Sequence, residues 1–234
     1  MPSGNPIALR RHKYAALLLV LLILLGTQSF DTRPGAEGFL SDAFRAVLGV
    51  SILLVVFERR RERIAMAAIF FAAVAIGLGH YFSAARLDHA LALSSHALKA
   101  LFLWVAVWVI LRELFRAPRV GAENVLGAIC GYLIAGEAWG EVNALTYLLM
   151  PAAYSINPAV NALLADWHGR VALFSYYSFA QLLTIGYADV TPVRAPATTL
   201  SLFAALFGVF YIGVVVSQLV GMAQSGRHAP PSDE

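Results

Sequence analysis

Charged residues are scarce in this sequence. Of its 234 residues, only 13% are Asp, Glu, Lys or Arg, whereas 59% are hydrophobic. An average soluble domain has roughly 25% charged and roughly 45–50% apolar residues, and it needs the polar ones to cover the surface of its core. The composition therefore excludes an ordinary water-soluble protein and indicates that lipid is the main solvent of the folded chain.

Cysteine is nearly absent as well, since Cys130 is the only one in the chain. It lies within a long apolar stretch, which excludes an intrachain disulfide framework. The sequence also lacks internal repeats and low-complexity tracts. The tails outside the hydrophobic part are about a dozen residues each, so we expect no soluble ligand-binding or catalytic domain.

Six hydrophobic runs are long enough to cross a bilayer, which takes about 20 residues at about 1.5 Å of rise per residue. They are approximately 14–30, 39–57, 64–82, 90–111, 123–149 and 196–222. A shorter apolar run at 171–185 cannot span and predicts a re-entrant helix. The first run follows basic residues, as in a signal peptide, but no small-x-small cleavage pattern follows it, so we expect a retained helix. The expected fold class is an all-α integral membrane protein with six transmembrane helices.

The basic residues gather on one side of these runs. If the N-terminus is cytoplasmic, eleven of the 17 Lys and Arg residues lie inside, namely Arg10, Arg11, Lys13, Arg59, Arg60, Arg61, Arg63, Arg112, Arg116, Arg119 and Arg227. Those on the opposite side are Arg33, Arg86, Arg170 and Arg194. The positive-inside rule therefore predicts that both termini are cytoplasmic and that 150–195 faces outside.

The runs divide into two blocks. Residues 14–116 contain four spans joined by short loops, and an Arg-Ala-Pro-Arg turn at 116–119 separates them from a second block at 120–224. The second block comprises one span, the short re-entrant helix and the last span. We expect the flanking segments, 1–13 and 225–234, to be cytoplasmic tails.

The stretch from 175 to 192 contains the most informative motif. Its core reads Thr184-Ile185-Gly186-Tyr187-Ala188-Asp189. This core resembles the Thr-Val-Gly-Tyr-Gly-Asp selectivity filter of the bacterial potassium channel family. The aromatic run before it and the Asp-Val-Thr-Pro ending resemble the same family. The similarity covers 120–224, including Gly208, Tyr211 and the Leu-Val-Gly sequence at 219–221, whereas the first four runs resemble such channels only in helix count.

The resemblance implies a passive channel for potassium or other monovalent cations, with no enzymatic activity and no cofactor apart from potassium ions in the filter. One chain supplies one filter strand, so a ring of ligands implies a homotetramer in a lipid membrane, here the plasma membrane of a bacterium. Residues 120–224 would then be a pore domain of outer helix, pore helix, filter and inner helix. No nucleic acid is implied. A weakly selective cation channel and a non-conducting membrane sensor or assembly subunit remain as alternatives.

The ligands in such a filter are backbone carbonyls, which replace the water around the ion. By resemblance, potassium binds at Thr184, Ile185, Gly186 and Tyr187, and the filter extends to Ala188. Carbonyls that point to one axis require a backbone that alternates between ordinary and left-handed conformations, which favours glycine at intervals. Gly186 meets this requirement. Ala188 stands where the family has its second glycine, and a left-handed alanine costs about 1–2 kcal/mol.

Two elements next to the filter have expected roles. If 172–183 is a helix that enters from outside, its C-terminal carbonyls point at the ion path and favour a cation there. By resemblance, Tyr176 or Tyr177 would support the filter by hydrogen bonding to Tyr187 or to Asp189 at the outer mouth.

Gly208 and Gly213 lie in the last run. Gly208 follows Thr184 by 24 residues, where inner helices of similar channels have a hinge glycine. Bending there would widen a hydrophobic constriction at 214–220. A glycine in a membrane helix also permits close packing against a neighbouring helix, and both interpretations remain open.

The first four runs match the voltage-sensing domain of six-helix channels in number only. A voltage sensor needs several arginines on one helix, because each charge contributes only about 2.3 kcal/mol per 100 mV. The fourth run offers Lys99 alone at depth, so we expect a scaffold. Glu137 and Glu141 share one face of the fifth run, and we expect them to buttress the short helix or to pair with Arg170.

Four histidines map near the outer side, namely His80, His89, His96 and His168. Their spacing matches no metal motif, so we expect separate surface roles rather than a zinc or proton sensor. Ser94 and Ser95 lie beside His96 without a positioned acid or a glycine elbow, which argues against an intramembrane hydrolase.

Overall fold

The computed structural model describes residues 13–28, 37–79, 85–117, 121–164, 167–186, 189–217 and 221. Its α-helices are α2 (Lys13–Gln28), α3 (Glu37–Val55), α4 (Arg60–Gly79), α5 (Ala85–Arg116), α6 (Ala122–Leu149), α7 (Trp167–Leu182) and α8 (Ala195–Phe210). The shorter elements are the 3-10 helices η2 (Pro151–Ala153) and η3 (Pro158–Leu164), the strands β1 (Tyr154–Ile156) and β2 (Val190–Pro192), and a π-helical turn, η4 (Tyr211–Val216), that continues α8. Helices are present at all seven predicted runs, so the mostly helical fold is confirmed.

Three described helices are long and apolar enough to cross a membrane, namely Arg60–Gly79, Ala122–Leu149 and Ala195–Val215. Lys13–Gly26 and Ala43–Val55 are shorter apolar helices. These lengths and compositions support a membrane protein. The count of six spans stays a prediction.

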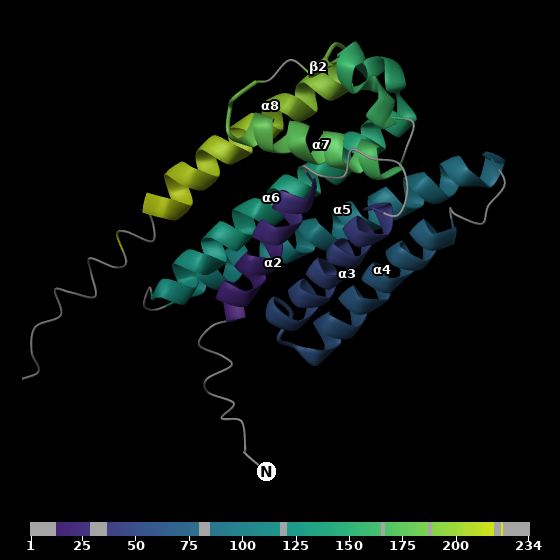
Figure 1. Cartoon of the computed structure of the whole chain (residues 1–234). Helices are drawn as coiled ribbons and strands as arrows, with labels where there is room; N and C mark the ends of the chain where they lie inside the picture. Colours follow the sequence, from purple (N-terminus) through teal and green to yellow (C-terminus); the bar gives the residue numbers. More distant parts are fainter. Residues whose placement is uncertain are drawn as a thin grey trace, which may run out of the picture.

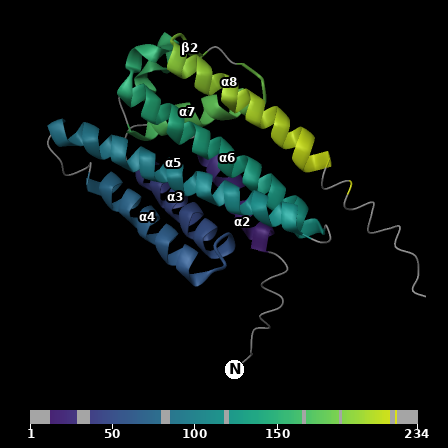
Figure 2. The same ribbon diagram turned by 180° about the vertical axis from the view of Figure 1, so that it is seen from behind.

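The helices lie on two sides of α6. In Figure 1, α7 and α8 lie above α6, whereas α3 and α4 lie below it, and Figure 2 shows the same arrangement from behind. α2 and α5 pack directly on α6, α3 packs on α2, and α4 packs on α5. On the other side, α7 packs on α6 and α8 packs on α7. α6 therefore contacts helices on both sides, and direct contacts of α5 with α7 and α8 add to it.

The apolar side chains of α2 are buried on one face of the helix and exposed on the others. Leu17, Leu21 and Leu24 recur at helical spacing and are buried in the main core of the protein. Leu19 and Leu22, on other faces of α2, are apolar and yet exposed. A helix that is apolar all round and buried on one face is suited to contact protein on that face and lipid on the others.

A smaller core lies at the end of the molecule where β1 and β2 pair. The strands are antiparallel, with Tyr154 opposite Pro192. The rings of Tyr154, Phe174 and Tyr177 meet edge to face there. Because β1 follows α6 and β2 precedes α8, this ribbon joins the segments on both sides of α7.

Candidate functional site

α7 ends in a Schellman motif. The amide of Thr184 donates to the carbonyl of Gln181 at 3.0 Å, and the amide of Ile185 donates to that of Ala180 at 2.9 Å. Thr184 has a φ of 55°, in the left-handed region where this motif usually has glycine. A β-branched residue in this region costs about 1–2 kcal/mol, so its conformation depends on the packing around it.

The left-handed conformation recurs two residues later, at Gly186, whose φ is 70°. Ile185, between them, has an ordinary φ, since Thr184 is the only described non-glycine residue with a positive one. The backbone thus alternates over 184–186, and the conformation predicted for Gly186 is confirmed. Nothing in the sequence predicted that Thr184 would also be left-handed. Tyr187 and Ala188 lie outside the described residues.

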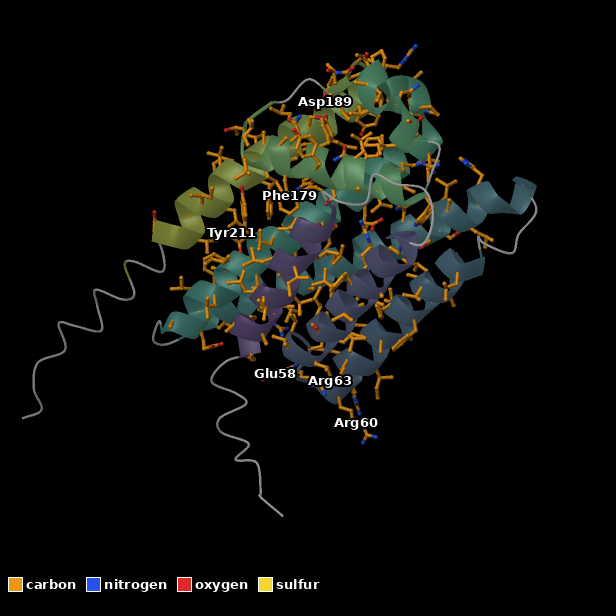
Figure 3. All side chains as sticks on the ribbon, in the orientation of Figure 1. Glu58, Arg60, Arg63, Phe179, Asp189 and Tyr211 are labelled. Carbon is orange, nitrogen blue, oxygen red and sulfur yellow. The ribbon has the colours of Figure 1, made fainter. Side chains whose placement is uncertain are left out.

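α7 packs closely against α6 at two glycines of α6. Gly136 and Gly140 lie one helical turn apart, and a Cβ on Gly140 would approach the Cα of Ser175 to 3.0 Å. On Gly136, a Cβ would overlap the ring of Phe179, which is labelled in Figure 3. The hydroxyl of Ser178 donates to the carbonyl of Gly136 at 2.9 Å. Small residues at this spacing let membrane helices approach closely, so the two backbones lie side by side.

The last residue of α7 is held from two sides. From α6, the hydroxyl of Tyr132 donates to the carbonyl of Leu182 at 3.1 Å. From α8, Gly208 packs so closely that a Cβ there would overlap the same carbonyl oxygen. This contact supports the packing interpretation of Gly208, whereas its role as a gating hinge stays a prediction.

α8 is fixed to α6 where η4 begins. The hydroxyl of Tyr211 donates to the carbonyl of Ala128 at 2.8 Å, and the side chain, labelled in Figure 3, closes over Gly131. A π-helical turn is wider than an α-helical one and is often found at functional sites. Gly213, within this turn, has no described neighbour within 4 Å of the position of a Cβ. α8 is therefore held at Tyr211 and has more room beyond it.

The outer end of the predicted filter is tied to the segment before α7. Asn157 donates its backbone amide to the carbonyl of Asp189 at 2.9 Å and its side-chain amide to Oδ1 of Asp189 at 3.2 Å. Its side-chain oxygen accepts from the amide of Ala159 at 3.1 Å, as a cap at the start of η3 does. Sequence reasoning missed Asn157, although Asn followed by Pro158 is a signal for a turn.

β1 is in turn anchored to α6 by Tyr154. Its hydroxyl donates to Oδ1 of Asn143 at 2.8 Å. Burial raises the pKa of Tyr154 above its ordinary value, so the hydroxyl stays protonated and remains a donor at physiological pH. The ribbon that holds Asp189 is thus connected to the helix that receives α7.

The two tyrosines predicted to support the filter have different surroundings. Tyr177 is buried, and its hydroxyl shares a 2.6 Å hydrogen bond with Ser201 of α8. Tyr176 is 44% exposed. For Tyr177, the hydrogen-bond partner that the structure describes is therefore Ser201 and not Asp189, so this side chain braces α7 against α8. The predicted bond to Tyr187 lies outside the described residues.

The two glutamates of α6 have different partners. Glu137 accepts a hydrogen bond from Ser175 of α7 at 2.9 Å, which is the buttressing contact predicted for it. Glu141 lies 2.5 Å from Nδ1 of His96. His96 is fully buried, so the prediction that it has a surface role is wrong. Its run is mostly apolar, and such a run does not reveal which face turns inward.

The remaining predicted polar residues are not grouped into a second site where the structure describes them. His89 is exposed, His80 lies outside the described residues, and so does the side chain of His168. Arg170 donates to the carbonyl of Leu164 at 3.2 Å. Within the described ranges, no three His, Cys, Asp or Glu side chains are grouped as a metal site would require.

A family model described as an ion channel matches residues 159–225. The matched range contains α7, the left-handed segment that follows it, β2, α8 and η4. No curated protein and no solved structure gave a match. The chain therefore contains an ion channel domain in its C-terminal part, within a mostly helical protein that has apolar helices of membrane-spanning length.

Proposed function

We propose that the protein is a passive channel for potassium ions, assembled as a homotetramer around a filter formed by 184–188. The observation that carries this proposal is the backbone of Thr184 and Gly186, which are left-handed on either side of an ordinary Ile185. Alternating handedness turns successive carbonyls toward one line, and a ring of such carbonyls replaces the water of a dehydrated cation. The segment lies within the residues that match an ion channel.

The surroundings of this segment suit the same chemistry. α7 ends beside it, so the helix directs the negative end of its dipole, about half a unit charge, toward the proposed ion path. The carbonyl ligands from each chain would be those of Thr184, Ile185, Gly186 and Tyr187. The Thr184 hydroxyl would add a ligand at the inner end. Residues 183–186 are exposed in the single chain, as a segment that faces a central pore requires.

Four chains complete the ring in this proposal. α8 has exposed apolar side chains at Leu202, Phe203, Leu206, Val209 and Phe210. In a closed tetramer, these side chains would line the pore or contact a neighbouring chain. The protein would lie in the bacterial plasma membrane with six spans and with both termini in the cytoplasm, and Asp189 would then lie at the outer mouth.

Potassium efflux from liposomes tests the proposal. The purified protein is reconstituted with potassium inside, and efflux is followed with a potassium-selective electrode. Gly186→Ala is the test variant, because a side chain is strained at a φ of 70°. Gly26→Ala in α2 is the matched control, since no described atom lies within 4 Å of its Cβ position.

We expect efflux from the wild type and from Gly26→Ala, and its loss in Gly186→Ala. Unchanged efflux in Gly186→Ala would overturn the assignment of the filter. An assembled wild-type tetramer without efflux would instead favour the non-conducting membrane sensor or assembly subunit.

A further inference from the structure

A charged cavity lies between the first helices and α7. Its volume is about 110 Å³, and α2, α3, α4, α5, α6 and the start of α7 line it. The charged residues among its described lining are Arg45 of α3, Lys99 of α5, and Glu137 and Glu141 of α6. A cavity of this size with polar groups in its wall has room for several water molecules.

His96 contacts two residues of the cavity wall. Its Nδ1 lies 2.5 Å from Oε2 of Glu141, and its ring stacks on that of Trp167 with centroids 4.5 Å apart and planes 26° apart. The side chain is fully buried. Its Nε2 has no hydrogen-bond partner in the part of the chain that the structure describes.

The contact with Glu141 fits a neutral His96 whose Nδ1–H is the donor. When Nδ1–H donates to the carboxylate, the neutral imidazole keeps a lone pair on Nε2. A buried nitrogen with a lone pair and no donor facing it can accept a proton. In this scheme, the proton would come from water in the neighbouring cavity.

Among the described residues that line the cavity, the positive and negative charges are equal in number. Arg45 and Lys99 supply two positive charges, and Glu137 and Glu141 supply two negative ones. The lining that α2 and α4 contribute is apolar or glycine, and α7 contributes Trp167. A proton on His96 adds one positive charge to this buried cluster, which favours the entry of water or the movement of a side chain.

A side chain that moves in this cluster would act directly on α7. Trp167 is the first residue of α7, and its ring contacts two groups of the cluster. His96 stacks on it, and Nζ of Lys99 lies 5.1 Å from its centroid. A protonated His96 would repel Lys99 across the same indole ring. Ser175, two turns further along α7, is bonded to Glu137, so the same cluster holds this helix at a second point.

We propose that His96, which contacts the wall of this cavity, binds a proton at Nε2, and that its protonation lowers conduction by releasing Trp167. The effect on conduction rests on the function proposed above. The binding of the proton does not, so the two are measured separately.

Proton binding is measured by nuclear magnetic resonance of the assembled protein with 15N-labelled imidazole rings. The chain has six histidines, and His96→Gln identifies the resonance of His96 by its loss. The spectra are recorded from about pH 8 to about pH 5, and we expect that resonance to change from neutral imidazole to imidazolium. A His96 resonance that stays constant over this range overturns the site, whether or not the protein conducts.

The effect on conduction is measured as potassium efflux over the same pH range. We expect efflux to fall as the pH is lowered, because each protonated His96 releases Trp167 in this proposal. Efflux from His96→Gln should be independent of pH. His89→Gln is the matched control, since His89 is exposed on the same helix, and its efflux should follow the wild type.

Two outcomes separate the parts of this proposal. If His96 titrates and His96→Gln nevertheless keeps the pH dependence of the wild type, the control of conduction is overturned. If His96 titrates and no variant conducts at any pH, the channel function fails while the proton site stands. Where His96→Gln does not assemble, Trp167→Leu replaces it. This variant should keep the titration of His96 and lose the pH dependence of efflux.

Discussion

Gly208 of α8 lies against the carbonyl group of Leu182, the last residue of α7. A Cβ at 208 would overlap a backbone oxygen that cannot rotate away, because it also accepts the hydroxyl of Tyr132. The contact is two residues before Thr184, where the left-handed segment begins. A shift of α8 at this level therefore acts directly on the end of α7 and on the proposed filter.

We expect Gly208→Ala to weaken the assembled protein rather than only to close the channel. The methyl group forces α7 and α8 apart, and overpacking of this kind costs about 1–3 kcal/mol. Size-exclusion chromatography and thermal dissociation of the tetramer measure the loss. Gly213→Ala is the control, because its Cβ position is open in the described structure. A Gly208→Ala protein that assembles normally and opens less often would support the hinge instead.

Barium should block conduction from the inside near Thr184. The ion is similar in size to potassium but carries two charges, so the same ring of carbonyls and hydroxyls should hold it more tightly. The measurement is potassium efflux with barium added on the cytoplasmic side. Block should weaken in Thr184→Ala and persist in Thr199→Ala, since Thr199 is an exposed threonine of α8. A conducting wild type that is indifferent to barium contradicts an inner site at Thr184.

Ala188→Gly should stabilise the tetramer or sharpen its selectivity for potassium over sodium. If the alternation at 184 and 186 continues, residue 188 is left-handed, and removing its methyl group relieves about 1–2 kcal/mol per chain. Thermal dissociation and the ratio of potassium to sodium flux are the two measurements. No change in either would mean that residue 188 has an ordinary backbone conformation. A low ratio in the wild type would support the weakly selective channel.

Asn157→Ala should loosen the outer end of the filter. The variant loses the hydrogen bond to the carboxylate of Asp189 and the cap of η3, which together cost about 1–3 kcal/mol. We expect a lower dissociation temperature and a lower ratio of potassium to sodium flux. Asn161→Ala is the matched control, because Asn161 is an exposed residue of the same short helix. Equal effects of the two substitutions would show that Asp189 does not depend on Asn157.

The helices could be predicted because their lengths follow from the thickness of a bilayer. The run predicted at 123–149 corresponds to α6 at Ala122–Leu149, and the short run at 171–185 corresponds to α7 at Trp167–Leu182. Local patterns such as Thr184 to Asp189 can also be recognised, because the chemistry of that segment depends on consecutive backbone groups.

The contacts that hold this segment could not be predicted in the same way. Asn157 and Asp189 are 32 residues apart, and Tyr177 and Ser201 are 24 apart, so no local pattern links them. The burial of His96 could not be predicted for a different reason. In a water-soluble helix, polar faces mark the outside, but in a lipid-facing helix the outside is apolar too. Both faces of such a helix are then apolar, so the periodicity of the sequence does not show that His96 lies in the interior.

The central part of α6 is buried on every side, since residues 134–138 are buried without interruption. A helix of this kind packs against other helices on both of its sides. Removing the first four helices would expose Glu141 to hydrocarbon without His96, at a cost of a few kcal/mol. The pore domain predicted at 120–224 would therefore not be independent of the rest of the chain, because part of its interior is supplied by the helices that precede it.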